Sequence, residues 1–197
     1  MKFRVTTLAA SLALLGCVSL GAHAASENLT VDNGSIATAQ NVNPFGAANT
    51  VHVFGLRGNV DFFGTTVFDN DDVDYYSFTL DADRTLTLSV DTPEGPFLDN
   101  DPIVGLFSSD GQLLARDDDA GPGYDSLLSY TTSAAGTYFA AVGGYVNSGF
   151  GFESGGASNF QYNLTISHVA SAVPVPAAVW LLGTGLLGLA SRKRRAV

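Results

Sequence analysis

The chain has 197 residues and a formal net charge of −10, but its charges are unevenly distributed. All nineteen acidic residues lie between Glu27 and Glu153, and the segment 25–172 contains only three arginines, which gives this segment a formal charge of −16. Such a surface repels nucleic acid and anionic membranes, so no nucleic-acid partner is expected. The single cysteine, Cys17, excludes an intrachain disulfide and any site that needs several cysteines.

Residues 1–24 have the parts of a secretory signal peptide. A basic beginning is followed by an apolar stretch over residues 8–20, and Ala22 and Ala24 occupy the two small-residue positions of a cleavage site. We therefore expect signal peptidase to cut after Ala24 and the chain to be exported across the inner membrane. The sequence LLGC, which ends at Cys17, offers an alternative, because it resembles a lipoprotein acylation site.

Residues 25–168 have the pattern of one all-β domain. In the segment DYYSFTL, Tyr76, Phe78 and Leu80 alternate with polar or amphipathic residues, which is the period of a half-buried strand. Turns rich in Gly and Asp separate the elements, and no stretch has a useful helical period. The sequence therefore predicts an antiparallel β-sandwich, jelly-roll-like in its order, although strands within 43–68 cannot be assigned. Further strands are predicted at 86–90, 102–107, 136–142 and 160–166.

Five segments of this domain occur in the same order as the corresponding segments of a known family. They are DNGSIATAQNV (32–42), DVDYYSFTL (72–80), DPIVGLFSSDGQLLARDDD (101–119), GYDSLLSYTTSAAGTYFAAVGGY (123–145) and FQYNLTIS (160–167). In this order they resemble the bacterial pre-peptidase C-terminal (PPC) domain, a secreted β-sandwich. The resemblance implies an accessory module without catalytic activity of its own.

Acidic residues crowd the sequence just before the strand at 74–80. Four acids lie within six consecutive positions: Asp69, Asp71, Asp72 and Asp74. Neighbouring carboxylates repel one another unless a cation lies among them. The spacing is not that of an EF-hand. The alternative is ordinary turn chemistry, in which Asp accepts hydrogen bonds from nearby backbone amides. A second candidate group, in the loop at 117–119, includes Asp118 and Asp119.

The resemblance makes this calcium hypothesis more specific. Collagen-binding relatives of the PPC domain hold calcium between the opening segment and the acids before the Tyr-x-Phe strand. Carried over by position, this implies Ca2+ ligands at Asp71 and Asp74, with Asp32 and Asn33 as further ligands. In the same relatives, surface tyrosines contact the ligand, which by position implies Tyr75 and Tyr76; packing in the core is the alternative for both.

Catalytic residues are poorly supplied. The segment after residue 24 has two histidines, and a Ser-His-Asp set would have to combine His52 with Ser126 and Asp125. No G-x-S-x-G elbow or other nucleophile turn accompanies them. We therefore predict that the protein is not an enzyme, with a secreted hydrolase as the least favoured alternative.

The end of the sequence combines a motif, an apolar stretch and a basic cluster. After a linker at 169–174, residues 175–191 are long enough to cross a membrane with local thinning, and the basic tail at 192–197 is expected to stay in the cytoplasm. The order resembles the PEP-CTERM sorting signal, although Val175 replaces the glutamate of its namesake. The resemblance implies cleavage near the proline motif by an exosortase in the inner membrane. The residues of this signal are Pro174, Val175, Pro176, Arg192, Lys193, Arg194 and Arg195.

Together these features predict a secreted, non-catalytic protein of the cell surface or extracellular matrix. The sorting signal implies release or transfer of the exported domain after processing, and an association with exopolysaccharide. The alternative is a calcium-dependent module that binds a polysaccharide or a protein fibre.

Overall fold

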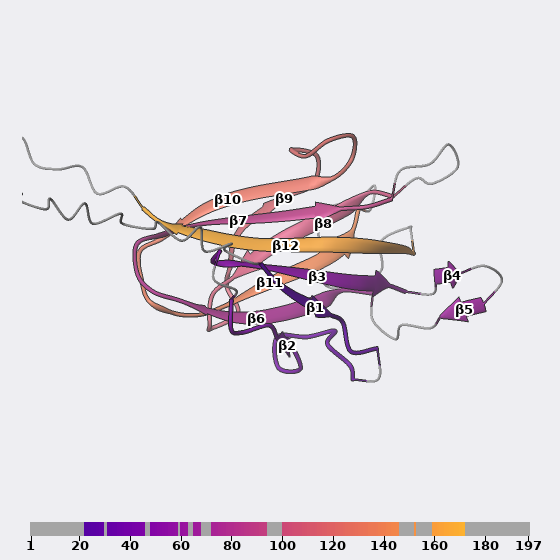
Figure 1. Cartoon of the computed structure of the whole chain (residues 1–197), viewed down its shortest axis with the longest axis horizontal. Coiled ribbons are helices and arrows are strands. Elements are labelled where there is room, and N and C mark those ends of the chain that lie inside the picture. The colour runs from indigo at the N-terminus through magenta and orange to yellow at the C-terminus, as the bar shows by residue number, and fades with distance from the viewer. Residues whose placement is uncertain are drawn as a thin grey trace, which may run out of the picture.

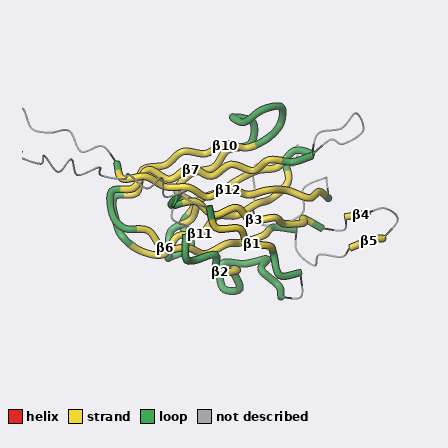
Figure 2. Tube along the Cα trace, viewed as in Figure 1, coloured by secondary structure: helices red, strands yellow, loops and turns green. Residues whose placement is uncertain are grey.

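The computed structural model describes residues 22–29, 31–45, 48–58, 60–62, 65–67, 72–93, 100–145, 152 and 159–171. In these ranges the chain forms two five-stranded sheets that pack face to face, with a separate two-stranded hairpin at one end (Figure 1). Strands and loops make up the whole of this described part (Figure 2). The predicted all-β sandwich is therefore confirmed.

Twelve strands lie in the described ranges, and most follow segments of alternating apolar and polar residues. They are β1 (His23–Ser26), β2 (Gln40–Asn41), β3 (Thr50–Arg57), β4 (Val60–Phe62), β5 (Thr65–Val67), β6 (Asp74–Leu80), β7 (Arg84–Asp91), β8 (Pro102–Phe107), β9 (Leu113–Asp117), β10 (Ser126–Thr132), β11 (Gly136–Gly144) and β12 (Phe160–Ala170).

The two sheets differ in which strands they contain. Sheet A has the order β1-β3-β12-β7-β10, sheet B has the order β2-β6-β11-β8-β9, and β4 pairs only with β5. The pairings are antiparallel except at one edge of each sheet, where β1 runs parallel to β3 and β2 runs parallel to β6. The predicted antiparallel pairing therefore holds in the rest of each sheet, and these two edge pairs make both sheets mixed. Long connections separate the partners in both pairs, so no tight hairpin forces an antiparallel pairing.

The core lies between the sheets and contains the side chains that alternate inward. On β6 these are Tyr76, Phe78 and Leu80, as the sequence pattern predicts, and Leu86 and Leu88 on β7 face them. Residues at alternate positions of a strand share one face, so β3, β12, β7 and β10 of sheet A each direct one set of side chains into the core and the other set outward.

A second apolar cluster covers the opposite side of sheet B. Val73, Tyr75, Phe107, Phe139 and Ala141 form it, and Ile36, Ala39 and Phe152 pack against them. Sheet B is therefore apolar on both faces in this region, whereas the outer residues of sheet A are mostly polar.

The strand predictions agree with the structure where the pattern was clear. The strand predicted at 102–107 is β8, those at 74–80 and 86–90 lie in β6 and β7, and those at 136–142 and 160–166 begin β11 and β12. Sequence reasoning left 43–68 unassigned, and this segment contains β3, a central strand of sheet A. Among the described residues, no helix has the length and apolarity needed to cross a membrane. The predicted membrane segment at 175–191 lies outside the described residues.

Candidate functional site

A hydrogen-bonded chain of polar groups crosses the core between the two sheets. The Tyr162 hydroxyl on β12 donates to Oδ2 of Asp74 on β6 over 2.6 Å, and the Tyr76 and Tyr162 hydroxyl oxygens are also 2.6 Å apart. Tyr162 has one hydroxyl proton, which Asp74 receives, so Tyr76 is the donor in the second bond. All three residues are fully buried. The network therefore links sheet A to the first residue of β6 in sheet B.

Burial and negative charge keep Tyr162 protonated. Desolvation is the largest cause that raises the pKa of Tyr162 well above its usual value of 10.0, followed by the charge of Asp74 and then by Tyr76 and Glu27. The ring also needs space on the neighbouring strand. A Cβ atom added at Gly55, which is opposite Tyr162 in the β3–β12 register, would lie 2.3 Å from its Cζ.

The segment between β1 and β2 is fixed to both sheets beside this network. Oε2 of Glu27 accepts a hydrogen bond from the backbone N–H of Leu56 over 2.7 Å, and Oε1 accepts one from the side-chain amide of Asn33 over 2.9 Å. The carbonyl of Asn33 in turn accepts a bond from the backbone N–H of Tyr75. Asn33 is buried, so these contacts hold the opening segment against the start of β6.

The residues expected to bind calcium here are only partly brought together. Asn33 lies beside the start of β6, whereas Asp32 is exposed and its Oδ1 accepts a bond from the backbone N–H of Gly34. Oδ2 of Asp74 is an acceptor for Tyr162, and Asp71 lies outside the described residues. The described ranges contain no group of three or more His, Cys, Asp or Glu side chains arranged to hold a metal. Calcium binding therefore stays a prediction.

The second acidic group belongs to the loop that connects β9 to β10. Asp117 accepts hydrogen bonds at Oδ2 from the backbone N–H groups of Ala120 and Leu127, which is the turn chemistry weighed as the alternative to a metal site. Asp118 is half-buried and Asp119 is exposed. Their assignment as metal ligands likewise stays a prediction.

The catalytic set considered from the sequence is not assembled. Ser126 is fully buried and its hydroxyl donates to the carbonyl of Pro102 over 2.7 Å. Asp125 accepts two hydrogen bonds at Oδ1 from the N–H and hydroxyl of Thr92. His52 lies on the outer face of sheet A, where its Nδ1 is 2.9 Å from the hydroxyl of Thr165. Ser126 and Asp125 thus have structural partners, and His52 contacts neither in these bonds.

The structure corrects the prediction that Tyr75 and Tyr76 contact a ligand at the surface. Tyr76 points into the main core and is 0% exposed, and Tyr75 lies in the second apolar cluster with 7% exposure. Neither ring offers a face to a ligand. The sequence pattern could not reveal the burial of Tyr75, because the residues that cover it, such as Phe152, come from distant parts of the chain.

Sequence reasoning missed a buried arginine at the end of β3. Arg57 is fully buried, its Nε donates to the carbonyl of Asp72 over 2.8 Å, and its guanidinium carbon lies 5.6 Å from the centre of the Phe160 ring. Gly144 makes room for it, since an added Cβ would lie 3.0 Å from the guanidinium carbon. The sequence signal for this site is an arginine at the end of a largely apolar segment. A charged side chain in that position indicates hydrogen-bonding partners, because arginine is rarely buried without them.

The predicted processing sites lie at or beyond the edges of the described chain. Ala22 is exposed, and Ala24 lies in β1, where it is opposite His52. Cleavage after Ala24 would leave Ala25 and Ser26 opposite Val53 and Phe54. The residues of the C-terminal signal, from Pro174 to Arg195, lie outside the described residues.

Two family models match separate parts of the chain. The model of the bacterial pre-peptidase C-terminal domain matches residues 72–144, which run from the start of β6 to the end of β11. The model of the PEP-CTERM protein-sorting motif matches residues 172–195. No curated protein matches the chain.

Several solved structures have a similar course of the chain at low identity. PliG of Aeromonas hydrophila, a periplasmic inhibitor of g-type lysozyme, is 14% identical with a TM-score of 0.45, covering 75% of this chain and 98% of that chain. The pre-peptidase C-terminal domain of a Bacillus anthracis collagenase is 13% identical with a TM-score of 0.37, covering 66% and 94%. PliG of Salmonella Typhimurium is 20% identical with a TM-score of 0.39, covering 66% and 96%.

The sorting motif indicates how the protein is exported and processed. It indicates an exported protein with a C-terminal membrane anchor that an exosortase cleaves at the inner membrane. The β-sandwich is the exported part, and its matched segment fits a non-catalytic module. Residues 72–144 therefore match the bacterial pre-peptidase C-terminal domain, and residues 172–195 match the PEP-CTERM protein-sorting motif.

Proposed function

We propose that this protein is a non-catalytic component of the bacterial cell surface or extracellular matrix, where it associates with exopolysaccharide after an exosortase removes its anchor. The observation that carries the proposal is the sorting motif at 172–195, at the end of an acidic, exported domain. The high negative charge of that domain keeps it soluble and away from anionic membranes once the anchor is gone.

The contacts of the most reactive side chains support a non-catalytic role. The Ser126 hydroxyl donates a hydrogen bond to the carbonyl of Pro102 on β8, and Asp125 accepts one from Thr92 just after β7, so both side chains stabilise the start of β10. In the described part of the chain, the hydrogen-bond partner of His52 is the hydroxyl of Thr165, so His52 shares no hydrogen bond with the other two members of the set, Ser126 and Asp125.

Fractionation of the native host tests this function. The processed protein is expected in the matrix or medium of the wild-type host, co-purifying with exopolysaccharide, and in the membrane of a host without the exosortase. Release of the protein from the matrix by a polysaccharide-degrading enzyme is the expected companion result. A processed protein that stays in the periplasm, apart from polysaccharide, would contradict the proposal.

Calcium binding at the start of β6 is the second candidate function. The charges of Glu27 and Asp74 both raise the pKa of Tyr162, so both carboxylates lie near its hydroxyl. Asn33 accepts a hydrogen bond from Tyr75, so the opening segment and the start of β6, which the resemblance implies as the two sides of a calcium site, are neighbours. A bound ion stabilises a fold by mass action, so millimolar calcium is expected to raise the melting temperature and EDTA to reverse the shift. An Asp71→Asn variant is expected to lose the shift, and an Asp110→Asn variant, in the exposed turn between β8 and β9, to keep it. Equal melting with calcium and with EDTA would rule this candidate out.

A further inference from the structure

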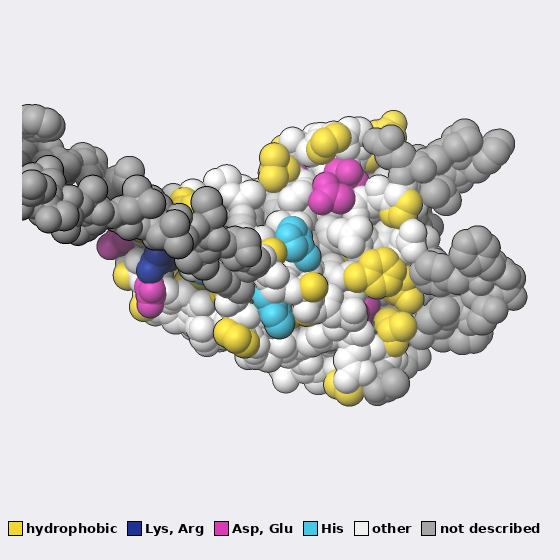
Figure 3. All heavy atoms as spheres, in the orientation of Figure 1, with side chains coloured by type: hydrophobic (Ala, Val, Ile, Leu, Met, Phe, Trp, Pro, Cys, Tyr) yellow, Lys and Arg dark blue, Asp and Glu magenta, His cyan; other side chains and the backbone are white. Residues whose placement is uncertain are grey.

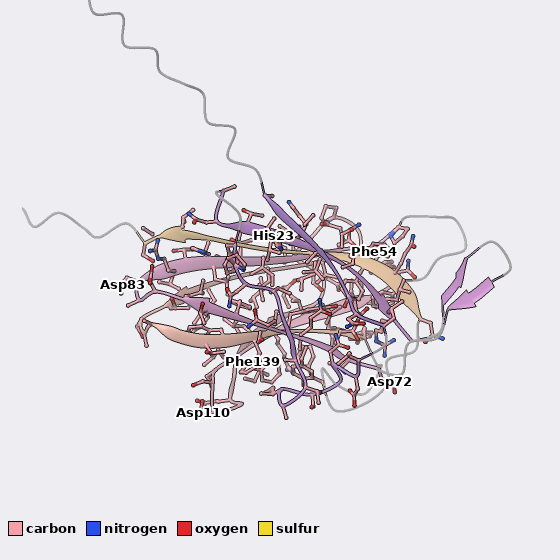
Figure 4. All side chains as sticks on the ribbon, turned by 60° about the horizontal axis from the view of Figure 1, so that its bottom comes forward. His23, Phe54, Asp72, Asp83, Asp110 and Phe139 are labelled. Atoms are coloured by element: carbon pink, nitrogen blue, oxygen red, sulfur yellow. The ribbon has the colours of Figure 1, made fainter. Side chains whose placement is uncertain are left out.

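Among the described residues, no second apolar cluster covers the outer face of sheet A, in contrast to that of sheet B. The apolar cluster around Tyr75 and Phe139 covers sheet B, whereas the outward residues of β3, β12, β7 and β10 are half-buried or exposed at most positions. Figure 4 shows Phe54 on the side of sheet A and Phe139 on the side of sheet B. Figure 3 shows the outer face of sheet A, and the part that the grey atoms leave uncovered is mostly neither acidic nor basic.

The strand register arranges the outward side chains in rows that cross four strands. One row contains His52, Thr165, Ser89 and Leu127, from β3 through β12 and β7 to β10. Directly opposite residues on neighbouring strands lie about 4.5–5.5 Å apart. Each row therefore presents closely spaced groups across the width of the sheet.

The rows on either side add further hydrogen-bonding groups. Phe54, Asn163 and Asp91 form the row on one side. The row on the other side consists of hydroxyl residues alone: Thr50, Ser167, Thr87 and Ser129. Hydroxyl and amide groups both donate and accept hydrogen bonds, so this face can pair with a ligand whose groups also do both.

Two exposed apolar side chains lie on the same face as the hydroxyl residues. Phe54 and Leu127 are each 41% exposed, on β3 and β10. An exposed aromatic ring can stack on the C–H groups of a sugar ring's face, while neighbouring amide and hydroxyl groups bind the hydroxyls that project from the ring's edge. Phe54 is next to Asn163 across the strands, so the stacking and hydrogen-bonding positions are adjacent.

Charge restricts the kind of polymer that fits this face. Among the outward residues of β3, β12, β7 and β10, Asp91 is the one acid and no Lys or Arg occurs. The domain around the face has a formal charge of −16 over residues 25–172. A polyanion would meet repulsion without a compensating cation, whereas a neutral polymer meets neither.

We propose that the outer face of sheet A, centred on Phe54, Asn163, Thr165 and Ser89, binds a neutral, hydroxyl-rich polysaccharide. This inference rests on the proposed association with exopolysaccharide and names the surface and the ligand class for it. Phe54 stacks on a sugar ring, and the amide and hydroxyl groups of the adjacent strands bind its hydroxyls. Extension over three rows allows several sugar units to bind one domain.

The test uses the processed protein purified from its host and the host's own exopolysaccharide, separated by anion exchange into neutral and anionic fractions. Affinity electrophoresis measures retention of the protein by each fraction. Phe54→Ala is expected to weaken retention by the neutral fraction about five- to ten-fold, the size of one lost aromatic contact. Thr165→Lys, which places a long cationic side chain on the face, is expected to weaken it at least as much.

Matched controls come from sheet B. Leu113→Ala truncates an apolar side chain of similar exposure (39%) on β9, and Thr79→Lys adds the same cation at an exposed position of β6. Both are expected to retain wild-type binding. Melting curves of all four variants establish that they are folded.

Each outcome has a distinct meaning. Loss of retention in the two sheet A variants, with both controls unchanged, supports the proposal. Retention by the neutral fraction that all four variants share overturns this surface but leaves the association with exopolysaccharide standing. Binding to the anionic fraction alone overturns the ligand class, and no binding to either fraction removes the proposed association as well. A dimer that Phe54→Ala dissociates would assign the face to a second copy of the chain and overturn the proposal.

Discussion

The hydroxyl of Tyr162 donates a 2.6 Å hydrogen bond to Oδ2 of Asp74, and this bond joins the two sheets through the interior of the sandwich. Tyr162 comes from the last strand of the fold and Asp74 from the first residue of β6, 88 positions earlier. Asp74 therefore has a structural role at the point where the sequence suggested a metal ligand. The same bond makes the stability of the sandwich sensitive to Tyr162.

We predict that Tyr162→Phe lowers the free energy of unfolding by about 1–3 kcal/mol, because Asp74 loses a buried donor and the Tyr76 hydroxyl loses its acceptor. Tyr124→Phe, whose side chain is 60% exposed, is expected to have a smaller effect. Chemical denaturation of both variants measures the difference. Equal stability of Tyr162→Phe and wild type would contradict the role of this network.

The same tyrosine predicts a loss of stability in alkaline solution. The pKa of Tyr162 is raised well above 10.0 in the folded protein, chiefly by burial and then by Asp74. Its contribution is fully present below the unfolded pKa of about 10, and it is lost as pH rises above that value, because only the unfolded state releases the proton. Above pH 10, the free energy of unfolding should therefore fall less steeply with pH in Tyr162→Phe than in wild type. Parallel pH profiles would show that another group controls alkaline unfolding.

A glycine opposite Tyr162 is predicted to be essential for the packing. Gly55→Ala places a methyl group within 2.3 Å of the Tyr162 ring, so the ring or strand β3 must move. We expect a loss of about 1–3 kcal/mol, the usual cost of overpacking. In a Tyr162→Leu background the same substitution should cost much less, since the clashing ring is gone. Additive effects of the two substitutions, measured by denaturation, would contradict this explanation.

Asp125 is predicted to matter through Thr92. Its Oδ1 accepts bonds from both the N–H and the hydroxyl of Thr92, each at 2.9 Å. Asp125→Ala removes both and is expected to cost about 1–3 kcal/mol. Asp119→Ala, in the exposed loop before it, serves as the control and is expected to change stability by less than about 0.5 kcal/mol. A comparable loss in both variants would point to a general effect of charge.

His168 should make the fold sensitive to mild acid. The pKa of His168 is lowered from 6.5, first by burial and then by the charge of Arg84, while Asp81 acts in the opposite direction. As pH falls below about 6.5 the unfolded state takes up the proton first, so stability falls until the folded pKa is passed. His168→Gln should flatten this part of the stability profile. An unchanged acid limb in the variant would assign the effect to the carboxylates.

The sequence pattern predicted local structure well and long-range contacts poorly. Alternation in DYYSFTL identified β6 and its inward residues Tyr76 and Phe78, because period two is a property of the strand itself. It could not predict that Phe152 would cover Tyr75, or that Asp74 would meet Tyr162, since those partners lie more than 75 residues away. Strand β3 was missed because its segment is rich in glycine and phenylalanine beyond Arg57, which obscures where a strand begins and ends.

The candidate sites also divide into those that lie in one contiguous segment, which sequence patterns predict, and those that the fold assembles, which they do not. The sorting signal was recognisable because its function resides in a contiguous segment, and the model match at 172–195 confirms it. Calcium ligands and sugar-binding faces depend on residues that the fold brings together from several strands. The row from His52 to Leu127 spans four strands, and no local pattern in any one of them indicates it.

The mass of the C-terminal peptide of the mature protein tests the central claim most directly. It should be measured on protein from the envelope and the medium of the native host, and of the same host without its exosortase. We predict a terminus near residues 173–177 in the wild-type host and an intact Val197 in the membrane of the mutant. A terminus at Val197 in both hosts, found only in the membrane, would mean that Val175 prevents recognition and that the protein is permanently anchored.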